Sequence, residues 1–364
     1  MKSDTPIHEV TEMTDRSVAA AEIMDLFQLT RRLIDIPSVT GSEGPFADFL
    51  ASYLRGLGYE VELQAVADER KNVIARTTAP PRIVFSTHMD TVPPHIISSE
   101  DAEQIYGRGS CDAKGIIAAQ IFAAQNLRSS GFDEIGLLFT VDEEMASAGA
   151  VVANDHAWAN ECRYLINGEP TDNLLAIGTK GSLRFTLTTS GRASHSAYPE
   201  QGESAIEKLL DVLAALRKCD WPADNFFGET TCNIGVFSGG TKPNVIPAAA
   251  AAEVQMRLVT EVEPIKEIIS DAVAGRAQIE YSSEHAPVRL MSLPELPQCV
   301  VRFTTDIPYL TRWGTPLLLG PGSILDAHTD HERISKRELS RAVELYVSIA
   351  RLLSATVETK SATT

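Results

Sequence analysis

Residues 83–90 read Ile-Val-Phe-Ser-Thr-His-Met-Asp, an apolar run that ends in a histidine and an aspartate two positions apart. Short apolar runs of this kind are typical of buried strands. Similar runs occur at residues 61–63, 73–75 and 135–141, and helical patterns lie between them. Strands that alternate with helices predict an α/β fold, with a mixed, mostly parallel sheet flanked by helices.

Three stretches have apolar residues at helical spacing. The first covers residues 19–34 and should stop before Pro37, because the residue before a proline is pushed out of the α region. The second runs from Pro45 to Leu57, with Gly58 as its C-cap, and the third covers residues 115–127. The first fifteen or so residues are polar and unpatterned, so we interpret them as an arm.

A different pattern begins near Gly178 and ends near Val288. There we expect strand, helix, strand, strand, helix and strand, at residues 182–189, 205–217, 231–237, 250–258, 264–274 and 278–281. This order is that of a split βαβ, or ferredoxin-like, unit. Runs at 300–303 and 316–319 and an amphipathic stretch at 336–353 then resume the first pattern. We therefore predict one domain of residues 1–177 and 289–364, interrupted by an inserted dimerisation or lid domain of residues 178–288.

Composition limits the possible partners. A chain of 364 residues is long for one hydrophobic core, which favours two domains. Its net charge of -17 would repel nucleic acid and anionic membranes, and no apolar stretch is long enough for a membrane helix. Five scattered cysteines without a C-x-x-C pair argue against a disulfide framework or a zinc ribbon. With no signal-peptide pattern at the start, we expect a cytoplasmic protein.

Histidines and acids also stand at the edges of other apolar segments. These residues are Asp112, Glu143, Glu144, Glu169 and His328. With His88 they offer two imidazoles and several carboxylates, which suit two cations that share one bridging carboxylate. Alone, His88 could be a hydrogen-bonded core histidine, and the acids at 143 and 144 a solvated loop. Together they predict a two-metal hydrolytic site.

Six segments extend this pattern along the chain. They are His-Met-Asp-Thr-Val-Pro (88–93), Gly-Arg-Gly-Ser-Cys-Asp-Ala-Lys-Gly (107–115), Asp-Glu-Glu (142–144), Gly-Glu-Pro-Thr (168–171), Ser-His-Ser-Ala-Tyr-Pro (194–199) and Gly-Pro-Gly-Ser (320–323) with His328. In this order they resemble the family of acetylornithine deacetylase and succinyl-diaminopimelate desuccinylase, to which aminoacylases and glutamate carboxypeptidases also belong. The resemblance covers roughly residues 20–353.

The resemblance implies two zinc ions per chain, with cobalt or manganese as alternatives. His88 and Glu169 would hold one ion, and Glu144 and His328 the other. Asp112 would bridge both ions.

It also implies roles for three further residues. Asp90 would accept the second ring N–H of His88 and so fix its tautomer. Glu143 would be the general base, taking a proton from the attacking water and passing it to the departing amine. His195 would stabilise the oxyanion, often from a neighbouring subunit, which implies a homodimer. His195 could instead be a turn residue that hydrogen-bonds its own backbone.

Two other interpretations of these segments are weaker. His331 lies within one turn of His328, but the resemblance aligns His328 with the ligand and Glu332 with a commonly seen acid. Residues 107–109 suggest a dinucleotide-binding loop, but Asp112 stands where the third glycine should be.

Four positions match substrate-binding residues of the family: Lys180, Asn244, Arg257 and Gly322. An arginine is suited to a bidentate grip on a substrate carboxylate, although these could also be strand-end or turn residues. Residues 320–323 and the Lys180-Gly181 pair look more like acetylornithine deacetylases than desuccinylases. Asp306, however, stands where we expect a glutamate in those deacetylases.

The expected activity is cleavage of the acyl amide of an N-acyl-L-amino acid, as in an acetylornithine deacetylase-like amidohydrolase acting on a small N-acyl amino acid or short peptide. A desuccinylase or a glutamate or dipeptide carboxypeptidase is the alternative within the same chemistry. A catalytically silent binding module is the remote alternative, and it is disfavoured because Glu143 and all five ligands are present.

Overall fold

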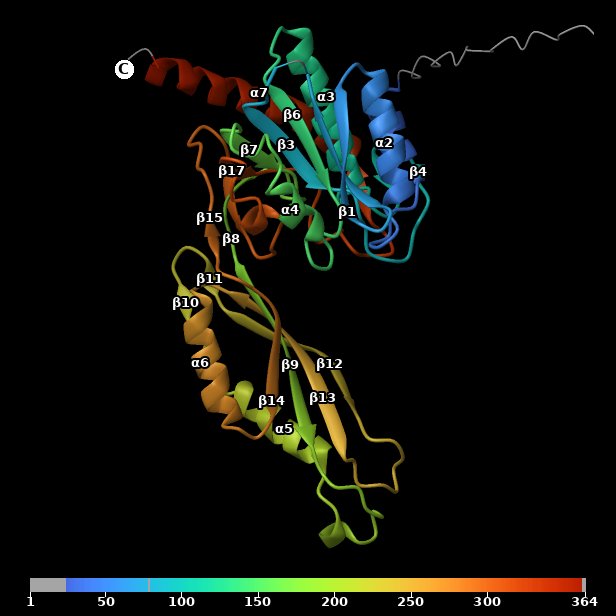
Figure 1. Cartoon of the computed structure of the whole chain (residues 1–364), viewed down its shortest axis with the longest axis vertical. Helices are drawn as coiled ribbons and strands as arrows, with labels where there is room; N and C mark the ends of the chain where they lie inside the picture. The colour runs from blue at the N-terminus through green and yellow to red at the C-terminus, as the bar shows by residue number, and fades with distance from the viewer. Residues whose placement is uncertain (1–23, 78, 362–364) are drawn as a thin grey trace, which may run out of the picture.

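The computed structural model describes residues 24–77 and 79–361, with side chains up to residue 355. It has two lobes, each with its own sheet and hydrophobic core (Figure 1). The expected polar arm and residues 19–23 of the first predicted helix lie outside the described residues. Within the described part, no helix is both long and apolar enough to cross a membrane.

A nine-stranded mixed sheet forms the centre of the larger lobe. Across the sheet the strands lie in the order β1 (Glu60–Ala67), β2 (Arg70–Arg76), β6 (Ile135–Thr140), β3 (Ile83–His88), β7 (Tyr164–Asn167), β17 (Thr315–Leu318), β8 (Leu175–Thr179) and β15 (Val288–Arg289), and β16 (Gln298–Val301) pairs with β8. The central strands β6, β3, β7 and β17 are parallel, whereas β1, β2 and β15 pair antiparallel at the flanks.

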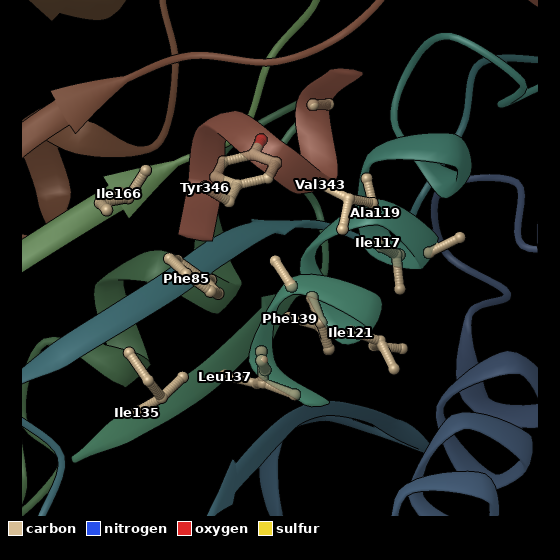
Figure 2. Close-up of a cluster of buried hydrophobic side chains, with 14 of the residues drawn as sticks. Phe85, Ile117, Ala119, Ile121, Ile135, Leu137, Phe139, Ile166, Val343 and Tyr346 are labelled. Carbon is tan, nitrogen blue, oxygen red and sulfur yellow. The ribbon is translucent and has the colours of Figure 1, made fainter. Parts of the chain in front are cut away.

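Helices cover both faces of this sheet. They are α1 (Leu26–Ile34), α2 (Gly44–Gly56), α3 (Lys114–Ser129), α4 (Ala148–Ala153) and α7 (Lys336–Ser361). Strand residues alternate between the faces, so Phe85 and Phe139 pack into the main core with α1, α2, α3 and α7 (Figure 2). Val84 and Leu138 face the opposite way, toward α4 and the buried Trp313. The large sheet buried on both faces confirms the predicted α/β class.

The first helix begins later than its apolar pattern suggests. Asp25 caps it, because its carboxylate accepts the backbone N–H groups of Phe27 and Gln28 while the Gln28 side chain accepts the Asp25 N–H. Helix α1 therefore starts at Leu26, and Met24 lies outside it. The predicted range was wrong at residues 24 and 25, because the Asp25 cap fixes the first turn of the helix at Leu26.

The smaller lobe is a four-stranded antiparallel sheet with helices on one face (Figure 1). Its strands lie in the order β12 (Thr231–Gly239), β13 (Ala249–Leu258), β9 (Gly181–Ser190) and β14 (Gln278–His285). Helices α5 (Ala205–Leu216) and α6 (Val262–Val273) pack on it through a core that includes Leu183, Phe185, Leu209 and Ile265. The expected β-α-β-β-α-β order is confirmed, with a hairpin of β10 (Ala223–Asp224) and β11 (Gly228–Glu229) added.

A third, small sheet contains strands that are too short to show a period in the sequence. It joins β18 (Arg333–Ser335), β5 (Gln104–Tyr106) and β4 (Ser99–Glu100). Arg333 lies opposite Tyr106 in this sheet. The pairing therefore brings the segment after His328 beside the loop that leads to Asp112.

Candidate metal centre and active site

The carboxyl ends of the central parallel strands carry the candidate site. Strand β3 ends at His88, β6 leads into the turn at 142–144, and Glu169 follows β7. These strands are parallel neighbours, so their carboxyl ends lie along one edge of the sheet, where open α/β sheets bind ligands.

His88 is fully buried and is held through both ring nitrogens. Its Nε2 lies 2.9 Å from Asp112 Oδ1. Its Nδ1 lies 2.9 Å from the backbone carbonyl oxygen of Asp90 and 3.5 Å from the Asp90 carboxylate. The closer acceptor for the Nδ1–H of His88 is therefore the backbone carbonyl of Asp90. The sequence had led us to expect the Asp90 carboxylate in this role.

The Asp90 carboxylate instead organises the turn that carries the two adjacent acids. It accepts the backbone N–H of Glu143 at 3.1 Å and that of Glu144 at 3.2 Å, and the Thr40 hydroxyl at 2.9 Å. These bonds hold the backbone and leave both glutamate side chains free for other roles. Sequence spacing alone did not show this contact.

An ion-pair network of Arg70 with the buried acids Glu43 and Asp142 also holds this turn. Arg70 Nη2 lies 2.7 Å from Asp142 Oδ1 and 2.7 Å from Glu43 Oε1. Asp142 has a positive φ of 73° and its other oxygen accepts the Ala148 N–H. Arg70 and Glu43 were not predicted, because nothing in the local sequence links them to residue 142.

His328 faces the other side of Asp112. Its Nε2 lies 2.9 Å from Glu144 Oε1 and 3.3 Å from Asp112 Oδ2. The two oxygens of Asp112 thus face two different imidazoles, and Glu169 Oε2 lies 4.0 Å from His88 Nε2. His88, Asp112 and Glu144 each offer a ligand atom within 4.8 Å of the other two.

His331 is separated from this group. It is exposed, and Glu332 beside it points inward and is buried. The structure therefore brings His328, and not His331, to the acids.

The electrostatics of the cluster favour cations. Burial, together with the neighbouring carboxylates, raises the pKa of Glu169 and of Glu143 well above the usual range. Hydrogen bonds to Asp112 and Glu144 raise the pKa of His328 to about 10. Imidazole and carboxylate donors around an excess of buried negative charge fit a pair of divalent metal ions.

Glu332 holds the loop that presents Asp112. Its Oε1 accepts the backbone N–H groups of Gly109, Cys111 and Asp112 at 2.9, 3.1 and 3.1 Å. Its Oε2 lies 2.6 Å from Arg108 Nη1 in a fully buried ion pair. Loss of one partner of such a pair typically lowers the free energy of unfolding by about 3–5 kcal/mol. Because Glu332 is held by this pair and bonds to the backbone of residues 109–112, it fixes the position of Asp112.

Gly322 lies behind this loop and does not line the cavity. It has a positive φ of 84°, and a Cβ at this position would lie 2.9 Å from Cys111 Sγ and 2.7 Å from Ile334 Cδ1. Its neighbour Gly320 lies against Glu169, since a Cβ there would be 2.4 Å from the Glu169 carbonyl oxygen. The structure thus explains these glycines by close packing.

A cavity of about 230 Å³ lies between the two lobes. The larger lobe contributes the acids Asp112, Glu143, Glu144 and Glu169, together with His328, Phe303, Thr304 and Tyr309. The smaller lobe contributes Ser182, Arg184, Gln255, Arg257, Ser283 and His285. Arg257 is half-buried, and its Nη1 donates to Thr304 Oγ1 at 3.2 Å. Arg257 therefore lines the same cavity as four of the candidate ligands.

Lys180 lies near the junction of the lobes but outside the cavity lining. It is buried, and its ammonium group donates to the backbone carbonyl of Glu229. This contact matches the structural alternative for Lys180.

His195 and Asn244 lie together at the far end of the smaller lobe. The Asn244 carbonyl accepts the Ser196 N–H at 3.1 Å, and His195 forms a bridge with Val245. The exposed His195 ring accepts the Ala197 N–H through Nδ1 at 3.1 Å, as in the turn interpretation. Strand β9 has 10 residues, and at ~3.3 Å per residue it separates this end from the cavity by about 30 Å. Neither side chain reaches the cavity of its own chain.

Comparison with known proteins places the chain among peptidases. Residues 177–279 match the M20 peptidase dimerisation domain. The chain is 36% identical to a peptidase M20 domain-containing protein of Schizosaccharomyces pombe, over 88% of this chain and 83% of that protein. It is 35% identical to a probable carboxypeptidase of Aspergillus terreus, over 94% and 91% of the two chains. The fold is also that of an M20 family metallo-carboxypeptidase from Sulfolobus solfataricus, with 15% identity, a TM-score of 0.72 and 89% and 98% coverage.

Proposed function

Because the chain belongs to the M20 peptidase family, we propose that it hydrolyses the amide bond of an N-acyl-L-amino acid or short peptide and releases an amino acid with a free α-carboxylate. The observation that carries this proposal is one cavity that joins four of the five candidate metal ligands with Glu143 and Arg257. An acetylornithine deacetylase-like activity is the finer form suggested by residues 320–323. The relatives named probable carboxypeptidases favour the alternative, a short peptide as substrate.

The proposed metal centre uses five residues, four of which line the cavity, while the buried His88 reaches it through its contact with Asp112. His88 and Glu169 would hold one divalent cation and Glu144 and His328 the other, with Asp112 between them. The two Asp112 oxygens support this arrangement, because each faces a different imidazole. Zinc is the first candidate, with cobalt or manganese as alternatives. When bound, such ions polarise the substrate carbonyl and lower the pKa of water.

Glu143 is the proposed general base. It lines the cavity and its backbone N–H is held by Asp90, while none of the residues that the structure describes hydrogen-bonds its side chain. Burial raises the pKa of Glu143, and a raised pKa suits a carboxylate that accepts a proton from water and returns it to the leaving amine.

Arg257 is the proposed binding site for the substrate α-carboxylate. It is half-buried in the cavity wall opposite the acids, and its donors not bonded to Thr304 can form a bidentate contact with a carboxylate. A substrate whose α-carboxylate is held by Arg257 would have its scissile amide bond directed toward the proposed metal ligands and Glu143.

The test of the proposed function compares free acids with their α-amides. The wild type is expected to cleave N-acyl-L-amino acids and short peptides with a free carboxylate at least about a hundredfold better, in kcat/KM, than the same compounds as α-amides. Arg257→Ala should lose about as much on the acids and little on the amides. Arg217→Ala, which changes an exposed arginine just after the end of α5, should change neither rate. Equal wild-type rates on acids and amides would refute carboxylate recognition.

A homodimer would explain how His195 could take part in catalysis although it lies far from the cavity of its own chain. The match to a peptidase dimerisation domain covers residues 177–279, most of the smaller lobe, and His195 is exposed at the free end of that lobe. We therefore place the His195 imidazole in the cavity of the second subunit, where it would stabilise the oxyanion.

Mixing two inactive variants tests this arrangement. His195→Ala should lower kcat by about 10²–10³-fold, as the loss of one oxyanion donor does. Heterodimers of His195→Ala with Glu143→Ala should recover activity, because one cavity then has its own Glu143 and His195 of the partner subunit. A mixture of Glu143→Ala with the double variant should recover none. No recovery in the first mixture, with heterodimers shown to form, would place His195 outside the site.

A further inference from the structure

The sheet of the smaller lobe presents two rows of polar side chains to the cavity. Alternation along β9 turns Leu183 and Phe185 toward the helices, so Ser182 and Arg184 face the opposite way. The pairing register adds two neighbours to each residue, and all six side chains line the cavity. The first row consists of Ser182, Arg257 and His285. The second row consists of Arg184, Gln255 and Ser283.

A hydrogen-bonded chain orients the guanidinium of Arg184. Its Nε donates to Gln255 Oε1 at 3.0 Å, and Gln255 Nε2 donates to Ser182 Oγ at 2.8 Å. The Gln255 amide is thereby fixed with its oxygen toward Arg184. Since Nε is occupied by this bond, the terminal N–H groups of Arg184 are the ones left for a ligand.

Arg184 and Arg257, one from each row, form a positively charged patch in the lining of the cavity. They are diagonal neighbours on adjacent strands, a spacing of roughly 7–8 Å in antiparallel sheets. Burial and the charge of Arg184 lower the pKa of Arg257, and the charge of Glu143 across the cavity opposes this shift only in part. Within residues 24–77 and 79–355, neither Arg184 nor Arg257 lies within ion-pair distance of a carboxylate. In a chain of net charge -17, two such neighbours are best explained by an anionic ligand.

We propose that Arg184 is a specificity-determining residue that binds a second carboxylate of the substrate, so that the enzyme prefers compounds whose released residue is glutamate or aspartate. This inference rests on the proposed function, in which Arg257 takes the α-carboxylate. The side-chain carboxylate then meets Arg184 in the neighbouring row. A cationic side chain, such as that of ornithine, would face two positive charges and be disfavoured, so this inference supports the carboxypeptidase alternative and not the acetylornithine deacetylase-like form.

A second cavity offers a competing location for the side chain. It has a volume of about 570 Å³, shares Arg257, Phe303 and Ile324 with the first, and is lined by apolar residues such as Val301 and Leu325. An enzyme that used this cavity for the side chain would prefer leucine over glutamate. The two arrangements therefore predict opposite orders of substrate preference.

The experiment compares kcat/KM for the N-acetyl derivatives of L-glutamate, L-glutamine, L-ornithine and L-leucine. The wild type should prefer glutamate over isosteric glutamine by about tenfold to a hundredfold, the contribution of a charge-assisted pair. Arg184→Gln should reduce this ratio to near one, mainly through KM, and Arg184→Lys should restore it in part. The control Arg217→Gln should keep the wild-type ratio.

A binding measurement separates this inference from the proposed function. Calorimetric titration of zinc-loaded protein with L-glutamate and L-glutamine should show the same preference and its loss in Arg184→Gln. If no compound is cleaved, the proposed function fails while the binding ratio still decides the role of Arg184. Equal affinities in the wild type, an unchanged ratio in Arg184→Gln, or a preference for leucine would overturn the inference.

Discussion

Asp112→Ala is expected to abolish amide hydrolysis and to remove more than one metal ion per chain. The reason is the position of its two oxygens, which lie 2.9 Å from His88 Nε2 and 3.3 Å from His328 Nε2. A single carboxylate between two imidazoles serves both halves of the proposed centre, so its loss weakens both. Metal analysis after dialysis should fall from near two zinc ions per chain in the wild type to less than one.

Asp306→Asn is the matched control for this loss. Asp306 is a buried acid close to the same cluster, but its carboxylate accepts the Thr140 hydroxyl at 2.7 Å and belongs to no proposed ligand set. This variant should keep its metal content. A wild type that never binds more than one ion, or an Asp112→Ala variant that keeps two, would contradict the bridging role.

The predictable part of the site follows from the ends of parallel strands. His88 and Glu169 each follow an apolar run, and parallel strands must bring their carboxyl ends to one edge of the sheet. Residue type and position at the ends of the apolar runs were therefore enough to predict that these side chains lie close together. The same argument explains why the α/β class was predictable while short strands such as β4 and β18 were not.

The supporting contacts of the site were not predictable, because they join residues far apart in sequence. Glu332 binds the backbone of residues 109–112, and Arg70 binds Asp142. Neither contact has a periodic or local signature. Only the folded chain shows that these buried charges hold the loops carrying Asp112 and Glu144.

Strand length and direction decide which residues of the smaller lobe reach the cavity. Strand β9 begins at the cavity and ends at the far loop, so Arg184 near its start lines the cavity while His195 beyond its end does not. The sequence predicted this strand and assigned residues beyond both of its ends to a site, with Lys180 at one end and His195, often from a neighbouring subunit, at the other. The alternation of Ser182 and Arg184 was visible in the sequence, but which face of the sheet meets the cavity depends on how the lobes are joined.

Glu143→Ala is expected to lower kcat by about 10²–10⁴-fold while the protein keeps its metal ions. Asp90 holds residue 143 through its backbone N–H, so removal of the side chain leaves the turn in place. Among the described residues, the close ligand group contains Glu144 and not Glu143. A half-buried carboxylate beside the ligands but outside their group is suited to proton transfer, and its loss should affect the rate and spare the binding of the ions.

Glu144→Ala provides the matched comparison, because it changes the neighbouring acid on the same turn. Glu144 Oε1 lies 2.9 Å from His328 Nε2, so this variant should lose one metal ion together with its activity. Metal content and kcat measured on both variants distinguish the two acids. If Glu143→Ala loses metal and Glu144→Ala keeps it, the roles of ligand and base are interchanged. Glu144, which His328 contacts, would then be the general base.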